Sequence, residues 1–101
     1  MKIRAETLSK ILDGVLVRGN PDAVAAPFSI DTRTINPNEW FFVFVGEKVD
    51  GHDFIPEAIS KGAGGLIVSD ATRVPHEPKE LPVISIENPL KSLKDLIKTQ
   101  Y

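Results

Sequence analysis

The sequence has 101 residues, of which 42% are hydrophobic, and a formal net charge of −2 at pH 7. This length predicts one domain with its own apolar core, and the interspersed charges exclude the basic surface that binds nucleic acid. The absence of cysteine excludes disulfides and thiolate metal sites. No apolar run approaches the roughly 18 residues of a membrane span, and the first residues do not resemble a signal peptide. We therefore expect a cytoplasmic domain without a membrane or nucleic-acid partner.

The first part of the chain predicts a short helix, a strand and a turn. The helix begins at Thr7 or Ser9 and ends at Gly14, because glycine favours the left-handed backbone that closes many helices. An apolar strand over residues 15–17 follows. The turn-forming residues 19–22 end that strand.

The central part of the chain predicts two strands on either side of a tight turn. Residues 28–31 alternate apolar and polar side chains, as in a half-buried strand. Pro37 and Asn38 favour the two central positions of a type II turn, since asparagine tolerates the left-handed conformation. Residues 40–45 form the most apolar run, and their aromatic and β-branched side chains predict a central strand buried on both faces.

The last part of the chain predicts two helices and two strands. Asp53 is the expected N-cap of a helix that ends at Gly62. Short apolar strands are expected over residues 66–68 and 83–86. Asn88 is the expected cap of a last, amphipathic helix. Its apolar stripe consists of Leu90, Leu93, Leu96 and Ile97.

Strands that alternate with helices in this way predict an α/β domain of two or three layers around a small mixed, partly parallel sheet. In open sheets of this kind, ligands bind beyond the carboxyl ends of the strands. Two polar segments follow predicted strands, at residues 31–33 and 46–53. Their hydroxyl, guanidinium and backbone N–H groups can together hold a uracil edge or a phosphate. We therefore expect the binding site at these two segments.

The same polar side chains also have a purely structural interpretation. Asp31 and Arg33 can form an ion pair while Thr32 caps a turn. His52 can contact a ligand, or it can hold its own loop by bonding to a neighbouring aspartate. No second histidine lies at ligand spacing, so the sequence predicts no metal site.

Three segments are specific as an ordered set. They are the triplet Asp31-Thr32-Arg33, the Gly-Glu-Lys-Val-Asp-Gly-His-Asp-Phe sequence of residues 46–54, and residues 58–63. In this order they resemble the N-terminal domain of the Mur ligases, and the resemblance covers nearly the whole chain. The resemblance implies that residues 1–101 form a single domain with the fold of the Mur ligase N-terminal domain. One departure is Asn38, where members of the family usually have glycine.

The resemblance implies a division of labour among three domains. The first holds the uridine-diphosphate end of a UDP-N-acetylmuramoyl-peptide, the second binds ATP and Mg²⁺ and makes an acyl-phosphate, and the third places the incoming amine. Only the first matches this chain, in which residues 62–65 lead into a strand and do not form a phosphate loop. We therefore expect no cofactor and no catalysis here, and the ATP-binding and C-terminal domains are the expected partners within the enzyme.

The family motif also implies which residues bind the substrate. The backbone at Ile30, the Thr32 hydroxyl and the loop over residues 46–49 line the uridine pocket, and Asp31 and Arg33 shape or touch it. His52 contributes to the same site or fixes its loop together with Asp50. The complete implied set is Ile30, Asp31, Thr32, Arg33, Gly46, Glu47, Lys48, Val49 and His52.

Several functions remain open within this resemblance. Gly46-Glu47 and Asp31-Thr32-Arg33 look more like the ligase that adds D-alanyl-D-alanine to the UDP-muramoyl-tripeptide. The ligase that adds the third residue of the peptide has a similar domain, more often with serine at position 32. A stand-alone protein that binds a nucleotide sugar or acts as a scaffold would keep the same fold. The gene beyond Tyr101 discriminates a ligase from the stand-alone protein, because a Gly-Lys-Thr phosphate loop favours a ligase and a stop codon favours the stand-alone protein.

Overall fold

The computed structural model describes residues 3–25, 27–92 and 94. A five-stranded sheet of order β2-β7-β6-β5-β4 forms the centre of the domain. In that order its strands are Val15–Arg18, Val83–Ser85, Gly65–Val68, Trp40–Phe42 and Phe28–Ser29. β2 runs antiparallel to β7, and the other neighbours are parallel. This mixed, largely parallel sheet confirms the predicted fold class.

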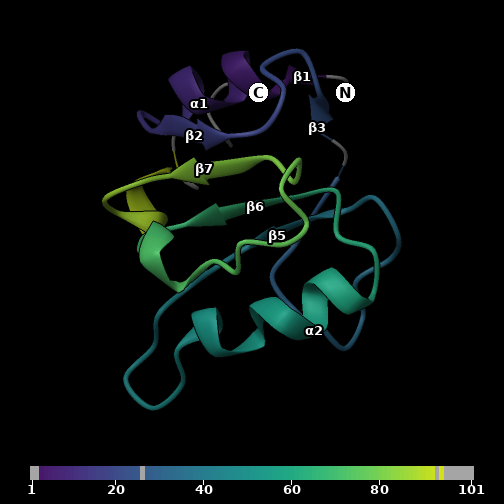
Figure 1. Ribbon diagram of the computed structural model, residues 1–101. Coiled ribbons are helices and arrows are strands. Elements are labelled where there is room, and N and C mark those ends of the chain that lie inside the picture. Colours follow the sequence, from purple (N-terminus) through teal and green to yellow (C-terminus); the bar gives the residue numbers. More distant parts are fainter. Residues whose placement is uncertain (1–2, 26, 93, 95–101) are drawn as a thin grey trace.

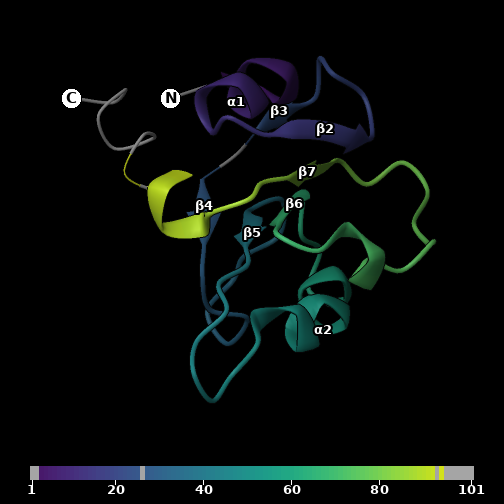
Figure 2. The same ribbon diagram turned by 90° about the vertical axis from the view of Figure 1, so that its left-hand side faces the viewer.

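Helices cover both faces of the sheet, so the domain has three layers (Figures 1 and 2). On one face lie α1 (Ala5–Ile11) and a small antiparallel pair, β1 (Ile3–Arg4) with β3 (Val24–Ala25). On the other face lies α2 (Ile55–Ser60), which directly follows the 3-10 helix η1 (Gly51–Phe54). A second 3-10 helix, η2 (Ala71–Arg73), follows β6. The sequence patterns did not predict the β1–β3 pair, whose two-residue strands are too short to show a periodicity.

The alternation of side chains along β5 explains why both faces need a cover. Trp40 and Phe42 project into the core beneath α1, whereas Phe41 and Val43 project into the core beneath α2. All four side chains are buried, which confirms the prediction of a central strand buried on both faces. The strand is shorter than predicted, because Val45 leaves the sheet and is 55% exposed.

The backbone confirms two of the predicted turn residues. Asn38 has a φ of 72°, and the Glu39 N–H donates to the Asn36 carbonyl oxygen at 3.1 Å, which closes the predicted turn. Gly62 has a φ of +88° where α2 ends. Both positions needed the left-handed conformation that the residue types suggested.

Three predicted helix boundaries are wrong. α1 begins at Ala5, and not at Thr7 or Ser9. Asp13, with a φ of 56°, is the left-handed residue after α1, whereas Gly14 is needed because a Cβ there would lie 2.6 Å from the Ser85 carbonyl oxygen. Asp53 does not cap α2, which continues from η1 with no side-chain cap. Asp50 is instead the N-cap of η1, because its carboxylate accepts the His52 N–H at 2.9 Å. At the last two boundaries, a neighbouring aspartate lies close to the residue that was expected.

The structure describes only the beginning of the last predicted helix. The Asn88 side chain accepts the Lys91 N–H at 3.1 Å, which confirms Asn88 as the cap. Leu90 is 58% exposed, so it does not join the core. Leu93, Leu96 and Ile97 lie outside the described residues. Among the helices of the described part, none combines the length and the apolar character needed to cross a membrane.

A substitution at Gly65 tests how tightly β5 and β6 pack in the core. Gly65 and Trp40 are partners in the parallel register of β6 and β5, and a Cβ on Gly65 would lie 2.4 Å from the buried indole ring. We predict that Gly65→Ala lowers the free energy of unfolding by about 1–3 kcal/mol, as overpacking does in other cores. Urea unfolding measures this change. Gly46→Ala is the matched control, because its Cβ would meet no atom closer than 3.4 Å. Equal effects of the two variants would contradict the packing argument.

Candidate functional site

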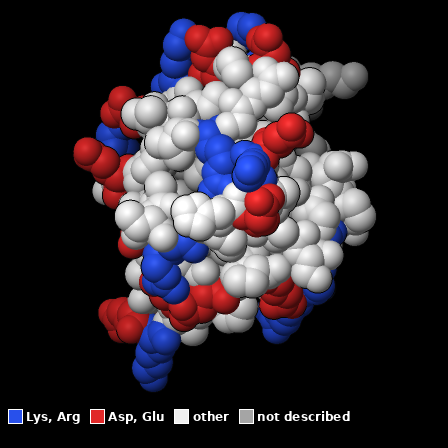
Figure 3. Space-filling view, in the orientation of Figure 1, with Lys and Arg blue, Asp and Glu red and all other residues white. Residues whose placement is uncertain are grey.

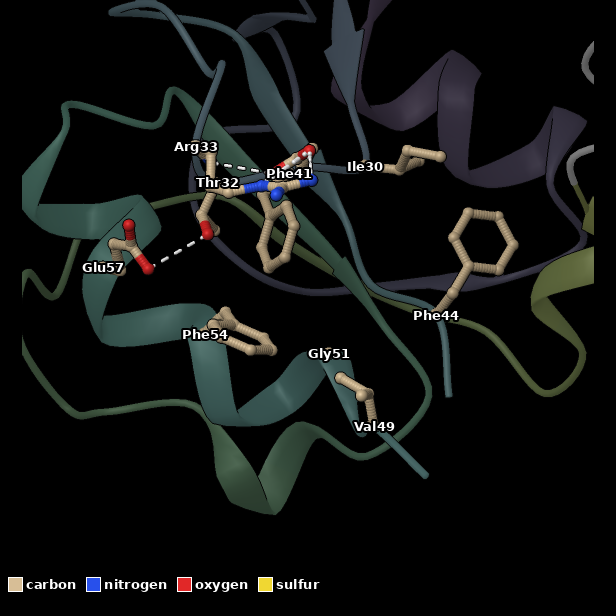
Figure 4. Close-up of a pocket in the computed structure, with 10 residues that line it drawn as sticks. Ile30, Thr32, Arg33, Phe41, Phe44, Val49, Gly51, Phe54 and Glu57 are labelled. Atoms are coloured by element: carbon tan, nitrogen blue, oxygen red, sulfur yellow. Dashed lines mark hydrogen bonds and ion pairs between the residues drawn. The ribbon is translucent and has the colours of Figure 1, made fainter. Parts of the chain in front are cut away.

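A cavity of about 560 Å³ opens where the segments following β4 and β5 meet α2 (Figure 4). β4 and β5 are parallel neighbours, so the residues after both strands emerge at the same edge of the sheet. The cavity is lined mainly by apolar side chains, with polar groups on the side of residues 31–33. The lining residues are Ile30, Asp31, Thr32, Arg33, Phe41, Phe44, Val49, Gly51, Phe54 and Glu57.

Asp31 and Arg33 form an ion pair at the rim of the cavity. The Asp31 carboxylate accepts the Arg33 backbone N–H at 2.8 Å and the Nη2 group at 2.8 Å. The side-chain hydrogen bond from Arg33, followed by the backbone one, lowers the pKa of Asp31 from 3.8 to about 2. The predicted structural pair is therefore present, and both residues also line the cavity.

Thr32 lies deeper in the cavity wall and is only 5% exposed. Its hydroxyl contacts Glu57 Oε2 at 3.0 Å, an interaction drawn as a dashed line in Figure 4. The Lys61 ammonium group donates to the Thr32 carbonyl oxygen at 2.6 Å and pairs with Glu57 Oε1 at 3.3 Å. Thr32 does not cap a turn, as the structural interpretation proposed, because two side chains of the α2 segment hold it.

The predicted loop after β5 is a narrow hairpin. The Gly46 N–H donates to the Val49 carbonyl oxygen at 2.7 Å, and the Gly51 N–H donates to the Phe44 carbonyl oxygen at 2.8 Å. Of the predicted loop residues, Val49 lines the cavity. The other three predicted loop residues lie at the exposed end of the hairpin and do not line the cavity: Gly46, Glu47 and Lys48.

His52 is buried away from the cavity lining, at 3% exposure. Its Nδ1 lies 2.7 Å from Asp50 Oδ1, and its Nε2 accepts the Asp70 N–H at 3.1 Å. Because Nε2 accepts, the neutral ring carries its proton on Nδ1 and donates it to Asp50. Both ring nitrogens are therefore used, and the histidine clamps its loop to the turn before η2.

Arg73 strengthens the same clamp from η2. Its guanidinium group pairs with Asp50 Oδ2 at 3.2 Å and also with Asp53. The pKa of Asp50 is lowered, first by the backbone hydrogen bond from His52 and then by the bond from its side chain. These contacts hold the segment that carries Val49 and Phe54 to the cavity.

Sequence reasoning missed half of the cavity lining. Phe41 lies in the predicted buried strand and is indeed buried, and Phe54 is the last residue of the motif over residues 46–54 and is 40% exposed. Phe44 stacks on Phe42 with ring centroids 4.8 Å apart. Glu57 had no local signal, because its partner Thr32 lies 25 positions earlier. Gly51 lies in the predicted binding segment of residues 46–53, although the motif does not imply it as an individual site residue.

This arrangement suits binding better than catalysis. The apolar walls favour a flat ring, and the polar wall offers hydrogen bonds to its edge. Glu57 is already paired with Lys61, so Thr32 has no free base to activate it as a nucleophile. Within the described residues, no group of three or more His, Asp or Glu side chains is placed to hold a metal ion. The molecular face in Figure 3 shows mixed basic and acidic residues with no broad field of one sign.

Comparison with known proteins identifies the family. The profile of the Mur ligase family, catalytic domain, matches residues 28–101. A UDP-N-acetylmuramoyl-L-alanyl-D-glutamate--2,6-diaminopimelate ligase from Gloeobacter violaceus is 33% identical over 88 residues, which are 87% of this chain and 18% of the relative. A ligase of the same name from Clostridium tetani is 32% identical over 100% of this chain and 20% of its own length. The chain belongs to the Mur ligase family.

Solved structures share the fold. The UDP-N-acetylmuramoylalanyl-D-glutamyl-2,6-diaminopimelate--D-alanyl-D-alanyl ligase from Acinetobacter baumannii superposes with a TM-score of 0.78 at 20% identity, over 95% of this chain and 21% of that one. The MurF ligase from Thermotoga maritima in complex with ADP has a TM-score of 0.62 at 22% identity, over 75% of this chain and 17% of that one. The chain thus spans about a fifth of the length of these relatives.

The clamp made by His52 generates a stability prediction. His52→Ala leaves the partly buried Asp70 N–H without its acceptor and Asp50 without the ring N–H, so we expect a loss of about 1–3 kcal/mol in unfolding free energy. Urea unfolding measures the loss. His76→Ala is the control, because that histidine side chain is exposed. A His52 variant as stable as the control would rule out the clamp.

The ion pair at the cavity rim generates a pH prediction. Because the pKa of Asp31 is lower in the folded chain than its ordinary 3.8, the pair stabilises the fold above pH 3.8, and this contribution disappears as the pH falls through about 2. Carboxyl ¹³C shifts should give Asp31 a midpoint of about 2, and Arg33→Gln should raise that midpoint toward 3.8. Arg4→Gln, which removes the partner of Asp22, should leave it unchanged. An Asp31 midpoint insensitive to Arg33→Gln would refute the assigned cause.

Proposed function

We propose that this chain binds the uridine-diphosphate end of a UDP-N-acetylmuramoyl-peptide as the substrate-binding domain of a peptidoglycan-precursor ligase. One observation carries the proposal. In a chain of the Mur ligase family, the cavity lies at the carboxyl ends of two parallel strands and is lined by the Asp31-Thr32-Arg33 triplet. This is the edge of the sheet where α/β domains bind nucleotides.

The chemistry of the cavity supports a nucleotide base as the group that enters it. Ile30, Val49 and Phe54 are exposed apolar side chains around the opening, and a planar base can bury its faces against them. Thr32 offers a hydrogen bond to the edge of the base, and Arg33 offers a cation near the rim for phosphate. The exposed end of the hairpin, residues 46–48, is the proposed contact for the sugar and diphosphate that follow the base.

The remaining chemistry of such a ligase is assigned to other parts of a longer protein. The relatives are about five times as long as this chain, so ATP, Mg²⁺ and the incoming amine have room to bind elsewhere in them. ATP-binding and C-terminal domains are then the partners of this domain within one polypeptide. On this proposal the described residues bind substrate and perform no chemical step.

Two ligase activities are candidates for the complete protein. Thr32 and Glu47 resemble the ligase that adds D-alanyl-D-alanine to the UDP-muramoyl-tripeptide, and we retain this as the first candidate. The names of the sequence relatives favour the second candidate, the ligase that adds 2,6-diaminopimelate to UDP-N-acetylmuramoyl-L-alanyl-D-glutamate. An assay of the complete protein with both substrate pairs separates them, because each enzyme releases ADP with one pair and not with the other.

Nucleotide binding is tested by titrating the isotope-labelled chain with UDP-N-acetylmuramic acid and following amide shifts. We expect shifts confined to residues 30–33 and 46–54, and none with ATP at the same concentration. Phe54→Ala should weaken binding by roughly 1–2 kcal/mol, the usual contribution of an aromatic ring stacked on a base. Val17→Ala, which removes an exposed apolar side chain on β2, is the control. Shifts that are scattered over the chain, or equal with ATP, would overturn the proposal.

A further inference from the structure

Glu57 reaches from α2 to the polar wall of the cavity and meets Thr32 there (Figure 4). One carboxylate oxygen lies 3.0 Å from the Thr32 hydroxyl, and the other lies 3.3 Å from the Lys61 ammonium group. Lys61 also holds the Thr32 carbonyl oxygen at 2.6 Å. The backbone and the side chain of Thr32 are therefore both attached to the same helix segment.

The direction of the Thr32 hydroxyl proton follows from this contact. A carboxylate can only accept hydrogen bonds, whereas a threonine hydroxyl has one proton to donate and two lone pairs that accept. Thr32 must therefore give its one proton to Glu57. Because Thr32 is 5% exposed, water has little access to compete for that proton. Toward the cavity, the hydroxyl can act only as an acceptor.

A hydroxyl that can only accept discriminates between nucleotide bases, because the bases differ in the donors and acceptors along their hydrogen-bonding edges. Uracil carries an N–H at ring position 3, whereas cytosine carries a lone pair at the same position. An acceptor in the wall pairs with the first and repels the second. We propose that Glu57 is a positioning residue that orients the Thr32 hydroxyl and thereby makes the cavity select uracil over cytosine, a role that rests on the proposed nucleotide-binding function.

A glutamine at position 57 keeps the size of the side chain but no longer forces the Thr32 hydroxyl to donate its proton to residue 57. Its amide NH₂ group can donate to Thr32, and the hydroxyl is then free to turn its proton toward the cavity. The wall can then pair with either base. The preference for uracil should fall, and binding as such should survive.

The experiment compares UDP and CDP as ligands of the 101-residue chain by NMR titration. We expect the wild-type chain to prefer UDP, and Glu57→Gln to reduce the ratio of the two affinities about fivefold, the value of one hydrogen bond. Glu6→Gln is the matched control, because Glu6 pairs with Lys10 at the same i,i+4 spacing on α1, across the sheet. It should leave the ratio unchanged.

Substitutions of Thr32 separate orientation of the hydroxyl from general support of the fold. Thr32→Ser keeps a hydroxyl and should keep the preference for UDP, whereas Thr32→Val should lose it. Adding Glu57→Gln to Thr32→Val should then change the ratio no further, since no hydroxyl remains to be oriented. Amide spectra of each variant without ligand confirm that it is folded.

The possible outcomes are distinct. An unchanged UDP-to-CDP ratio in Glu57→Gln, or a further change when it is added to Thr32→Val, overturns the role of Glu57 and leaves the proposed function intact. A wild-type chain that binds UDP no better than CDP also overturns it. A wild-type chain that binds neither nucleotide overturns the proposed function itself, and the role of Glu57 with it.

Discussion

The burial of β5 on both faces is the constraint on which the rest of the structure depends. The three residues of β5 and the following Val43 are each at most 2% exposed, so apolar layers must cover the sheet on both sides. α1 supplies one layer and α2 the other. The parallel pairing of β5 with β4 then brings the two following segments to one edge, where loop residues are free of the core and can line a cavity.

α2 packs against the sheet and also contributes to the polar wall of the cavity. Ile55 and Ala58 are fully buried against the sheet, whereas Glu57 and Lys61 face the end of β4 and hold Thr32 from both sides. The packing of the helix therefore positions the polar wall, because a displacement of the core side chains would also displace the carboxylate. A six-residue helix can do this because the 3-10 turn before it is itself anchored through Asp50.

Most polar groups near the cavity are already paired with one another. Asp31 is paired with Arg33, and His52 uses both ring nitrogens on Asp50 and the Asp70 N–H. Such satisfied groups give shape to a site but leave few free donors or acceptors for a ligand, and the carboxylate next to the Thr32 hydroxyl is itself paired with Lys61. This pairing supports the proposed binding role of the cavity.

The sequence by itself determined the elements that depend on near neighbours. The left-handed turn at Asn38, the end of α2 at Gly62, the buried strand at β5 and the ordered motif of a Mur ligase could all be read from it. Tertiary structure decided which groups meet. Thr32 and Glu57 are 25 positions apart, so nothing in local spacing reveals that the hydroxyl is already engaged. The bond from His52 to the neighbouring Asp50 could be expected from the sequence, whereas only folding placed the Asp70 N–H, 18 positions away, against the other ring nitrogen. Hydrogen bonds between residues this far apart in the sequence depend on how the layers pack against each other. The types of the two side chains do not specify such bonds by themselves.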